Sequence, residues 1–112
     1  MGMMFKFYKR KFRNCLEPVF VMLIDRKKHL TIEAWDDLVL KITISILKSP
    51  EEYLGNDLPA HTMMCDVVYE LFEQFMKEKG SDSNAFPLIS QQLVDARRTN
   101  PEEREPTNQL TR

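Results

Sequence analysis

The segment from residue 31 to residue 48 constrains the fold of this chain more than any other. Its apolar residues recur at the spacing of one helical face, and a second apolar flank leaves only a narrow polar stripe. The two apolar sets are Trp35, Leu38, Val39, Ile42 and Ile46, then Leu40, Ile44 and Leu47. Thr31 is suited to be the N-cap of this helix. A helix that is apolar on nearly all sides needs neighbours on at least two sides, so the sequence predicts an all-α protein.

Three other segments have helical periodicity, over residues 5–25, 59–79 and 86–98. Pro18 lies inside the first and predicts a kink or a new helix start there, because proline lacks the backbone donor. Gly80 predicts the end of the second. No segment has the alternating pattern of a strand.

A short helix is expected between the two longest ones. Ser49, Pro50 and Glu52 form a capping-box pattern, in which Ser49 is the N-cap and the Glu52 side chain reaches back to it. Gly55 follows almost at once and predicts the C-cap.

The order of these helices predicts antiparallel packing of the α-solenoid, or HEAT-like, type. We expect a helical-repeat module over residues 1–80, a loop and a weak helix over 81–98, and a disordered tail over 99–112, where apolar residues are scarce. The structural core is expected to contain Trp35, Leu38, Ile42, Met64, Leu71 and Phe75.

The composition says more about the cellular compartment of this chain than about its function. The formal net charge is -1, from 16 basic and 17 acidic side chains, so no overall field favours nucleic acid or an anionic membrane. Two cysteines, Cys15 and Cys65, on apolar helix faces suggest buried thiols in a reducing compartment. No apolar run approaches the roughly 20 residues of a membrane span. Because the N-terminus also lacks a signal-peptide pattern, a cytoplasmic location is expected.

Few residues suggest chemistry. His61 and Cys65 are four apart and share a helix face, but no second pair completes a zinc site of about four ligands. Asp36, Asp37 and Glu33 near a helix start are explained by the helix dipole. Because no phosphate-binding loop, nucleophile elbow or metalloprotease motif occurs, we expect no enzyme activity, metal or cofactor.

The basic start of the chain is the sharpest functional candidate. Aromatic residues alternate there with cations, which could contact anionic lipid or the phosphates of a nucleic acid. The cations are Lys6, Lys9, Arg10, Lys11 and Arg13. The simpler interpretation, which we favour, is a helix whose rings pack inward while its cations face water; nucleic acid is the weakest alternative.

Residues 12–78 resemble the N-terminal helical-repeat region of the tuberin and Ral GTPase-activating protein family. The resemblance lies in a helix with a Cys-Leu pair, a polar connector, a helix start that carries Thr and then Trp, a loop with proline, and a helix with a Leu-Phe-Glu segment. The matching residues are Cys15-Leu16, Leu30-Thr31, Trp35, Leu38, Leu40, Pro50 and Leu71-Phe72-Glu73.

In that family the repeats act as a scaffold, and a separate C-terminal domain supplies a catalytic asparagine to the GTP site. The resemblance therefore implies a non-catalytic interaction module within a complex that regulates a Ral- or Rheb-type GTPase. No part of this chain matches the activating domain, so a fragment or short isoform is expected. Its partners would be protein subunits of that complex, and an uncapped end of the stack would favour self-association.

Overall fold

A computed structural model describes residues 2–98 and contains five helices in that range. They are α1 (Gly2–Lys27), α2 (Ile32–Lys48), α3 (Pro50–Leu54), α4 (His61–Lys79) and α5 (Ala85–Arg98). The described residues form no strand, which confirms the all-α prediction. The tail predicted over 99–112 lies outside the described residues.

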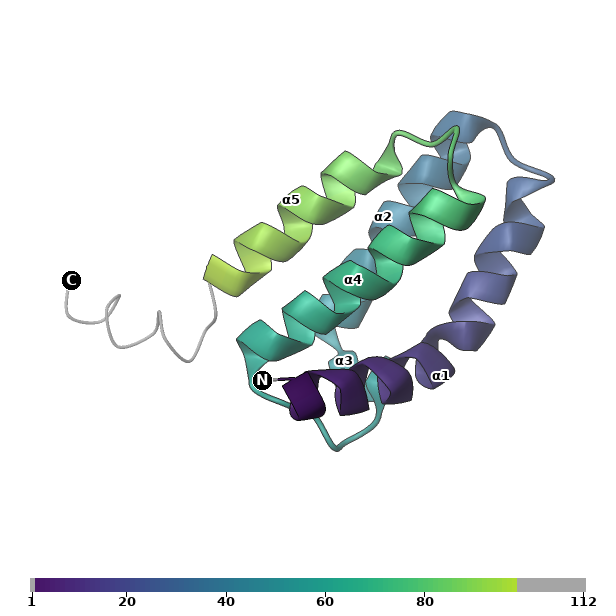
Figure 1. Ribbon diagram of the computed structural model, residues 1–112. Helices are drawn as coiled ribbons and strands as arrows, with labels where there is room; N and C mark the ends of the chain where they lie inside the picture. Colours follow the sequence, from purple (N-terminus) through teal and green to yellow (C-terminus); the bar gives the residue numbers. More distant parts are fainter. Residues whose placement is uncertain (1, 99–112) are drawn as a thin grey trace, which may run out of the picture.

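The four long helices form a closed ring of neighbours (Figure 1). α1 packs against α2 and α4, and α5 packs against the same two helices, so α2 and α4 are diagonally opposite. Figure 1 shows α1 antiparallel to α2 and α4 antiparallel to α5. The short α3 closes one end, against α1 and α2. This arrangement encloses one apolar core that draws on all five helices.

Helix α1 continues through Pro18 and bends in its middle (Figure 1). Proline cannot donate the hydrogen bond that would join residue 18 to the carbonyl of Asn14, and its ring crowds the preceding turn. The predicted kink is therefore present, without a new helix start. The first half of α1 contacts α3, the loop that follows it and Glu70 of α4, whereas the second half contacts α2 and the later part of α4.

Trp35 lies at the centre of the core and is fully buried. Its indole Nε1–H donates a hydrogen bond of 2.6 Å to the carbonyl oxygen of Leu23 in α1. The ammonium of Lys27 lies 4.9 Å from the indole ring centroid, on the solvent side. Trp35 thus joins α2 to α1 through packing, a hydrogen bond and a cation–π contact.

The buried face of α2 is rotated relative to our expectation. Leu38 and Ile42 are only partly buried, whereas Val39, Thr43 and Ile46 join Trp35 in the fully buried set. Thr43 fits there because its hydroxyl donates to the carbonyl oxygen of Val39 at 3.0 Å, which satisfies its polar group. The other expected core residues, Met64, Leu71 and Phe75, are buried on α4.

The start of α3 departs from the predicted capping box. Ser49 is the N-cap and Pro50 is the first helical residue, but no side-chain hydrogen bond caps this helix. The Ser49 N–H already donates to the carbonyl oxygen of Ser45, because Ser49 is also the C-cap of α2. The Glu52 side chain therefore has no free donor to reach. Gly55 ends α3 as expected, with a positive φ of 88° that glycine adopts without strain.

Helix α5 belongs to the same core as the rest of the chain. Ala85, Ile89 and Leu93 are buried in the common cluster, and α5 packs along both α2 and α4. The division we drew at residue 80 therefore does not correspond to a break in packing. Sequence reasoning underrated this helix because only three of its residues are fully buried.

Within residues 2–98, no helix combines the length and the apolar character that crossing a bilayer requires.

Candidate functional site

The two titratable residues of α4 with metal-ligand spacing are used in packing. His61 Nε2 lies 3.0 Å from the carbonyl oxygen of Ala96 in α5 and 3.6 Å from the Sγ of Cys65. Burial, followed by the charge of Asp66, raises the pKa of the Cys65 thiol to about 11. The thiol is therefore protonated at neutral pH, which makes it a poor nucleophile and a poor metal ligand. No group of three or more potential metal ligands occurs within residues 2–98.

The two adjacent aspartates near the start of α2 bind different partners. Asp36 accepts hydrogen bonds from the hydroxyl of Ser83 and, at 3.1 Å, from the backbone N–H of Asn84, just before α5. Asp37 pairs instead with Lys41 across one turn at 3.0 Å, on the surface. The two carboxylates therefore diverge and form no paired acid–base site.

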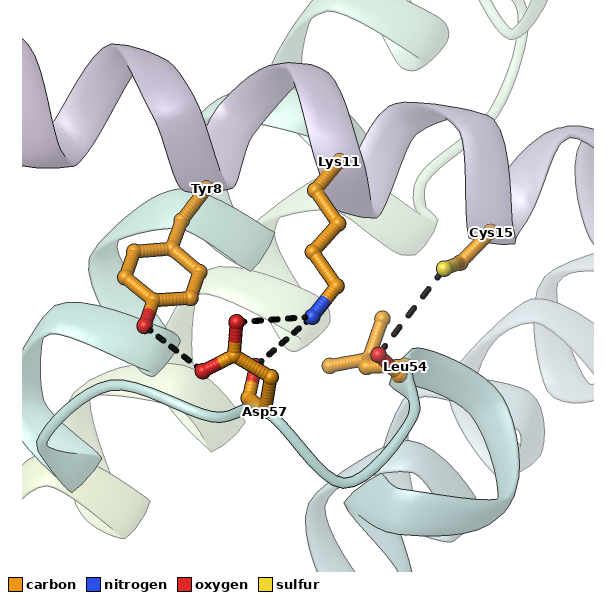
Figure 2. A network of polar contacts seen from close by, with 5 residues as sticks. All are labelled: Tyr8, Lys11, Cys15, Leu54 and Asp57. Atoms are coloured by element: carbon orange, nitrogen blue, oxygen red, sulfur yellow. Dashed lines mark hydrogen bonds and ion pairs between the residues drawn. The ribbon is translucent and has the colours of Figure 1, made fainter.

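The first half of α1 is tied to the loop after α3 by a polar network (Figure 2). The Tyr8 hydroxyl donates to Asp57 Oδ1 at 3.1 Å, and Lys11 Nζ lies 3.3 Å from Asp57 Oδ2 and 3.0 Å from the Asp57 carbonyl oxygen. The Cys15 thiol contacts the carbonyl oxygen of Leu54 at 3.8 Å. Burial and then the bond to Asp57 raise the pKa of the Tyr8 hydroxyl. This network attaches α1 to the rest of the bundle through contacts between protein groups.

The structure divides the five basic residues of the N-terminal segment into two groups. Lys9 pairs with Glu70 at 3.0 Å and Lys11 pairs with Asp57, so both are bound within the protein. Lys6, Arg10 and Arg13 are exposed and form no ion pair with another described residue. The inward-packing interpretation describes Tyr8 and Phe12, which are buried, but not Phe7, which is half exposed.

A groove with a volume of about 420 Å³ lies between the second half of α1 and α4. Its apolar part consists of Phe20, Val21, Ile24, Leu71 and Phe75. Phe20 and Phe75 stack within this lining, with ring centroids 4.5 Å apart and planes 11° apart. Val21 is 58% exposed, so this apolar side chain faces solvent.

Charged side chains of both signs surround these apolar residues. They are Arg13, Glu17, Asp25, Lys28, Glu78 and Lys79. Mixed charge beside an apolar strip suits an amphipathic helix of a protein partner better than a purely anionic ligand, which would meet three carboxylates.

Sequence reasoning missed this groove because periodicity over residues 5–25 predicted a helix there and gave Val21 no role. The available signal was a valine one turn after Glu17, on the face that also carries Arg10 and Arg13. An apolar residue on a charged helix face is common by itself, and only the neighbouring α4 turns it into part of a groove.

Comparisons with known proteins identify no relative: the chain matches no family model, no curated protein and no solved structure.

Proposed function

We propose that this chain is a non-catalytic helical interaction module, which binds an amphipathic helix of a protein partner in the α1–α4 groove. The observation that carries the proposal is the exposed Val21 in the same groove as the stacked Phe20 and Phe75, because an apolar strip between two helices accepts the apolar face of a third. The titratable groups that could suggest catalysis are engaged in packing, as the raised pKa of Cys65 illustrates.

We further propose that the partner belongs to a complex that regulates a Ral- or Rheb-type GTPase, in the cytoplasm. Support comes from the resemblance of residues 12–78 to the helical repeats of the tuberin and Ral GTPase-activating protein family. The neighbour relations are also those of two stacked antiparallel hairpins, α1–α2 and α4–α5, with α1 beside α4 and α2 beside α5. Residues of the resemblance such as Leu16, Trp35 and Phe72 are buried, as expected for a packing signature.

A matched pair of substitutions tests this function. Val21→Asp places a charge in the groove, whereas Leu88→Asp places one on α5, where Leu88 is 50% exposed and outside the groove. Proximity labelling in cells should find that Val21→Asp loses partner proteins that the parent and Leu88→Asp retain. The GTPase assignment requires that subunits of a GTPase-activating complex are among the lost proteins. Identical partner sets for all three chains would overturn the proposal.

A further inference from the structure

The outward face of the first half of α1 combines apolar and cationic side chains at helical spacing. Met3 and Phe7 are one turn apart and are 87% and 52% exposed. Lys6, Arg10 and Arg13 are all exposed and recur at intervals of four and three residues. At 3.6 residues per turn these five residues share one side of the helix, opposite the buried Phe12. We call these five residues the α1 outer face.

The charge of the α1 outer face is uncompensated within the fold. Lys9 and Lys11, which flank it, pair with Glu70 and Asp57, so these two cations already have acidic partners in the fold. Residues 2–16 contain five basic residues and no acidic one, although the net charge of the whole chain is only -1. The three remaining cations therefore face solvent together with Met3 and Phe7.

Two classes of anionic surface could use such cations. A nucleic acid presents phosphates on its outside and gains most from a face made of polar and basic groups. Exposed methionine and phenylalanine side chains gain more at a lipid interface, where the apolar side of a helix enters the boundary between headgroups and acyl chains while cations contact anionic headgroups. The rigid attachment of α1 through Asp57 also presents the face preformed, so binding does not require ordering of the helix.

We propose that the α1 outer face docks on bilayers that contain anionic phospholipids, with Met3 and Phe7 in the interface and Lys6, Arg10 and Arg13 on the headgroups. This site is separate from the protein-binding function proposed for the groove, apart from Arg13, which lies at the border of both. The tests therefore leave Arg13 unchanged.

The first test measures binding of the full chain to vesicles by co-sedimentation. Binding is expected to mixed phosphatidylserine–phosphatidylcholine vesicles and not to phosphatidylcholine alone, and it should weaken as salt screens the charges. Each cation near an anionic surface contributes about a fivefold factor in partitioning, so Lys6→Gln with Arg10→Gln should reduce binding about 25-fold. The matched control, Lys41→Gln with Lys48→Gln on α2, removes the same charge elsewhere and should change binding by less than about threefold.

The second test asks whether Phe7 enters the interface. In the Phe7→Trp variant, brominated acyl chains in anionic vesicles should quench the new indole. Trp35 supplies the internal control in the parent chain, because it is fully buried beneath Lys27 and should not be quenched.

Three results would overturn the lipid proposal. They are absence of binding to anionic vesicles at low salt, equal losses for the α1 and α2 double variants, and absence of quenching in Phe7→Trp despite binding. Binding of a nucleic-acid probe that is lost in the α1 variant, without vesicle binding, would assign the face to nucleic acid instead. Because Val21→Asp leaves the α1 outer face intact, it should retain vesicle binding, so this proposal and the proposed function can fail separately.

Discussion

Trp35 combines more interactions than any other residue of α2. Its indole is buried, donates to the Leu23 carbonyl oxygen, lies under Lys27, and has a ring centroid 6.4 Å from that of Phe75 in α4. A single side chain therefore contacts both α1 and α4 from α2. Its removal is expected to weaken α1, α2 and α4 together.

We predict that Trp35→Ala lowers the free energy of unfolding by about 3–5 kcal/mol, because the cavity spans the centre of the bundle. Trp35→Phe keeps most of the ring and loses the hydrogen bond to the Leu23 carbonyl oxygen. It should therefore lower the free energy of unfolding less than Trp35→Ala does, and the difference between the two variants should be about 1 kcal/mol or more. Urea denaturation followed by circular dichroism measures both. Stability of Trp35→Ala within error of the parent would contradict the buried position.

Asp36 and Asp37 are adjacent in the sequence and have different bonding partners. We predict that Asp36→Ala costs about 1–2 kcal/mol, because the Ser83 hydroxyl and the Asn84 N–H lose their acceptor at the start of α5. Asp37→Ala removes only a surface pair with Lys41 and should cost about 0.5 kcal/mol or less. Equal thermal shifts for the two variants would show that Asp36 does not anchor α5.

At the scale of the elements, α5 is the helix whose role the fold changes most. Three of its residues are fully buried, Phe86 and Ala96 pack against the same core, and Asp36 of α2 accepts a hydrogen bond from the N–H of Asn84, just before α5. Helix α5 therefore completes the bundle and covers the parts of α2 and α4 that α1 leaves open.

We predict that Ile89→Ala destabilises the whole chain by about 2–5 kcal/mol, since Ile89 is fully buried. The neighbouring Leu88→Ala, at a half-exposed position, should change stability by about 0.5 kcal/mol or less. Both changes in stability can be measured from the midpoints of denaturant unfolding, provided that the dependence of the unfolding free energy on denaturant concentration is unchanged. If Ile89→Ala were as mild as its control, α5 would be an appendage and not a part of the core.

Local sequence patterns predicted the elements well. Thr31 caps α2 as expected, accepting a hydrogen bond from the Ala34 N–H at 3.1 Å, and Gly55 and Gly80 follow the last residues of α3 and α4. These features depend on neighbours within one helical turn, which the sequence displays directly. The kink at Pro18 was predictable for the same reason.

The register of α2 and the connections between elements were not predictable. Leu38 and Val39 both belong to the same predicted apolar face, so periodicity could not decide which is fully buried, and Thr43 can be buried because its hydroxyl bonds within its own helix. Asp36 with Ser83, Lys9 with Glu70 and Val21 with α4 are pairings between distant positions. No local pattern encodes them, and the groove arises from such a pairing.

At the scale of the whole molecule, the buried thiol links stability to pH. The pKa of Cys65 is raised from its ordinary value of 9.0 to about 11, so the unfolded chain loses this proton first as pH rises. The contribution of Cys65 is therefore complete below about pH 9 and is lost as pH rises towards about 11.

We predict that this loss amounts to about 2 kcal/mol, and that Cys65→Ala shows a shallower decline of unfolding free energy over the same pH interval. Comparing the slopes of the parent and the variant cancels other groups that titrate there, such as Tyr8. Parallel curves would mean that the Cys65 thiol is not desolvated in the fold.

Both proposed interaction surfaces depend on residues 2–98 folding as one closed unit. Native-state hydrogen exchange tests this most directly, because it gives an opening free energy for each helix. Backbone amides near Ile89 and Leu93 in α5 should exchange only through openings within about 1 kcal/mol of those for buried positions of α2 and α4. If the α5 amides exchanged through openings about 3 kcal/mol or more cheaper, while α2 and α4 stayed protected, the closed four-helix ring would be contradicted.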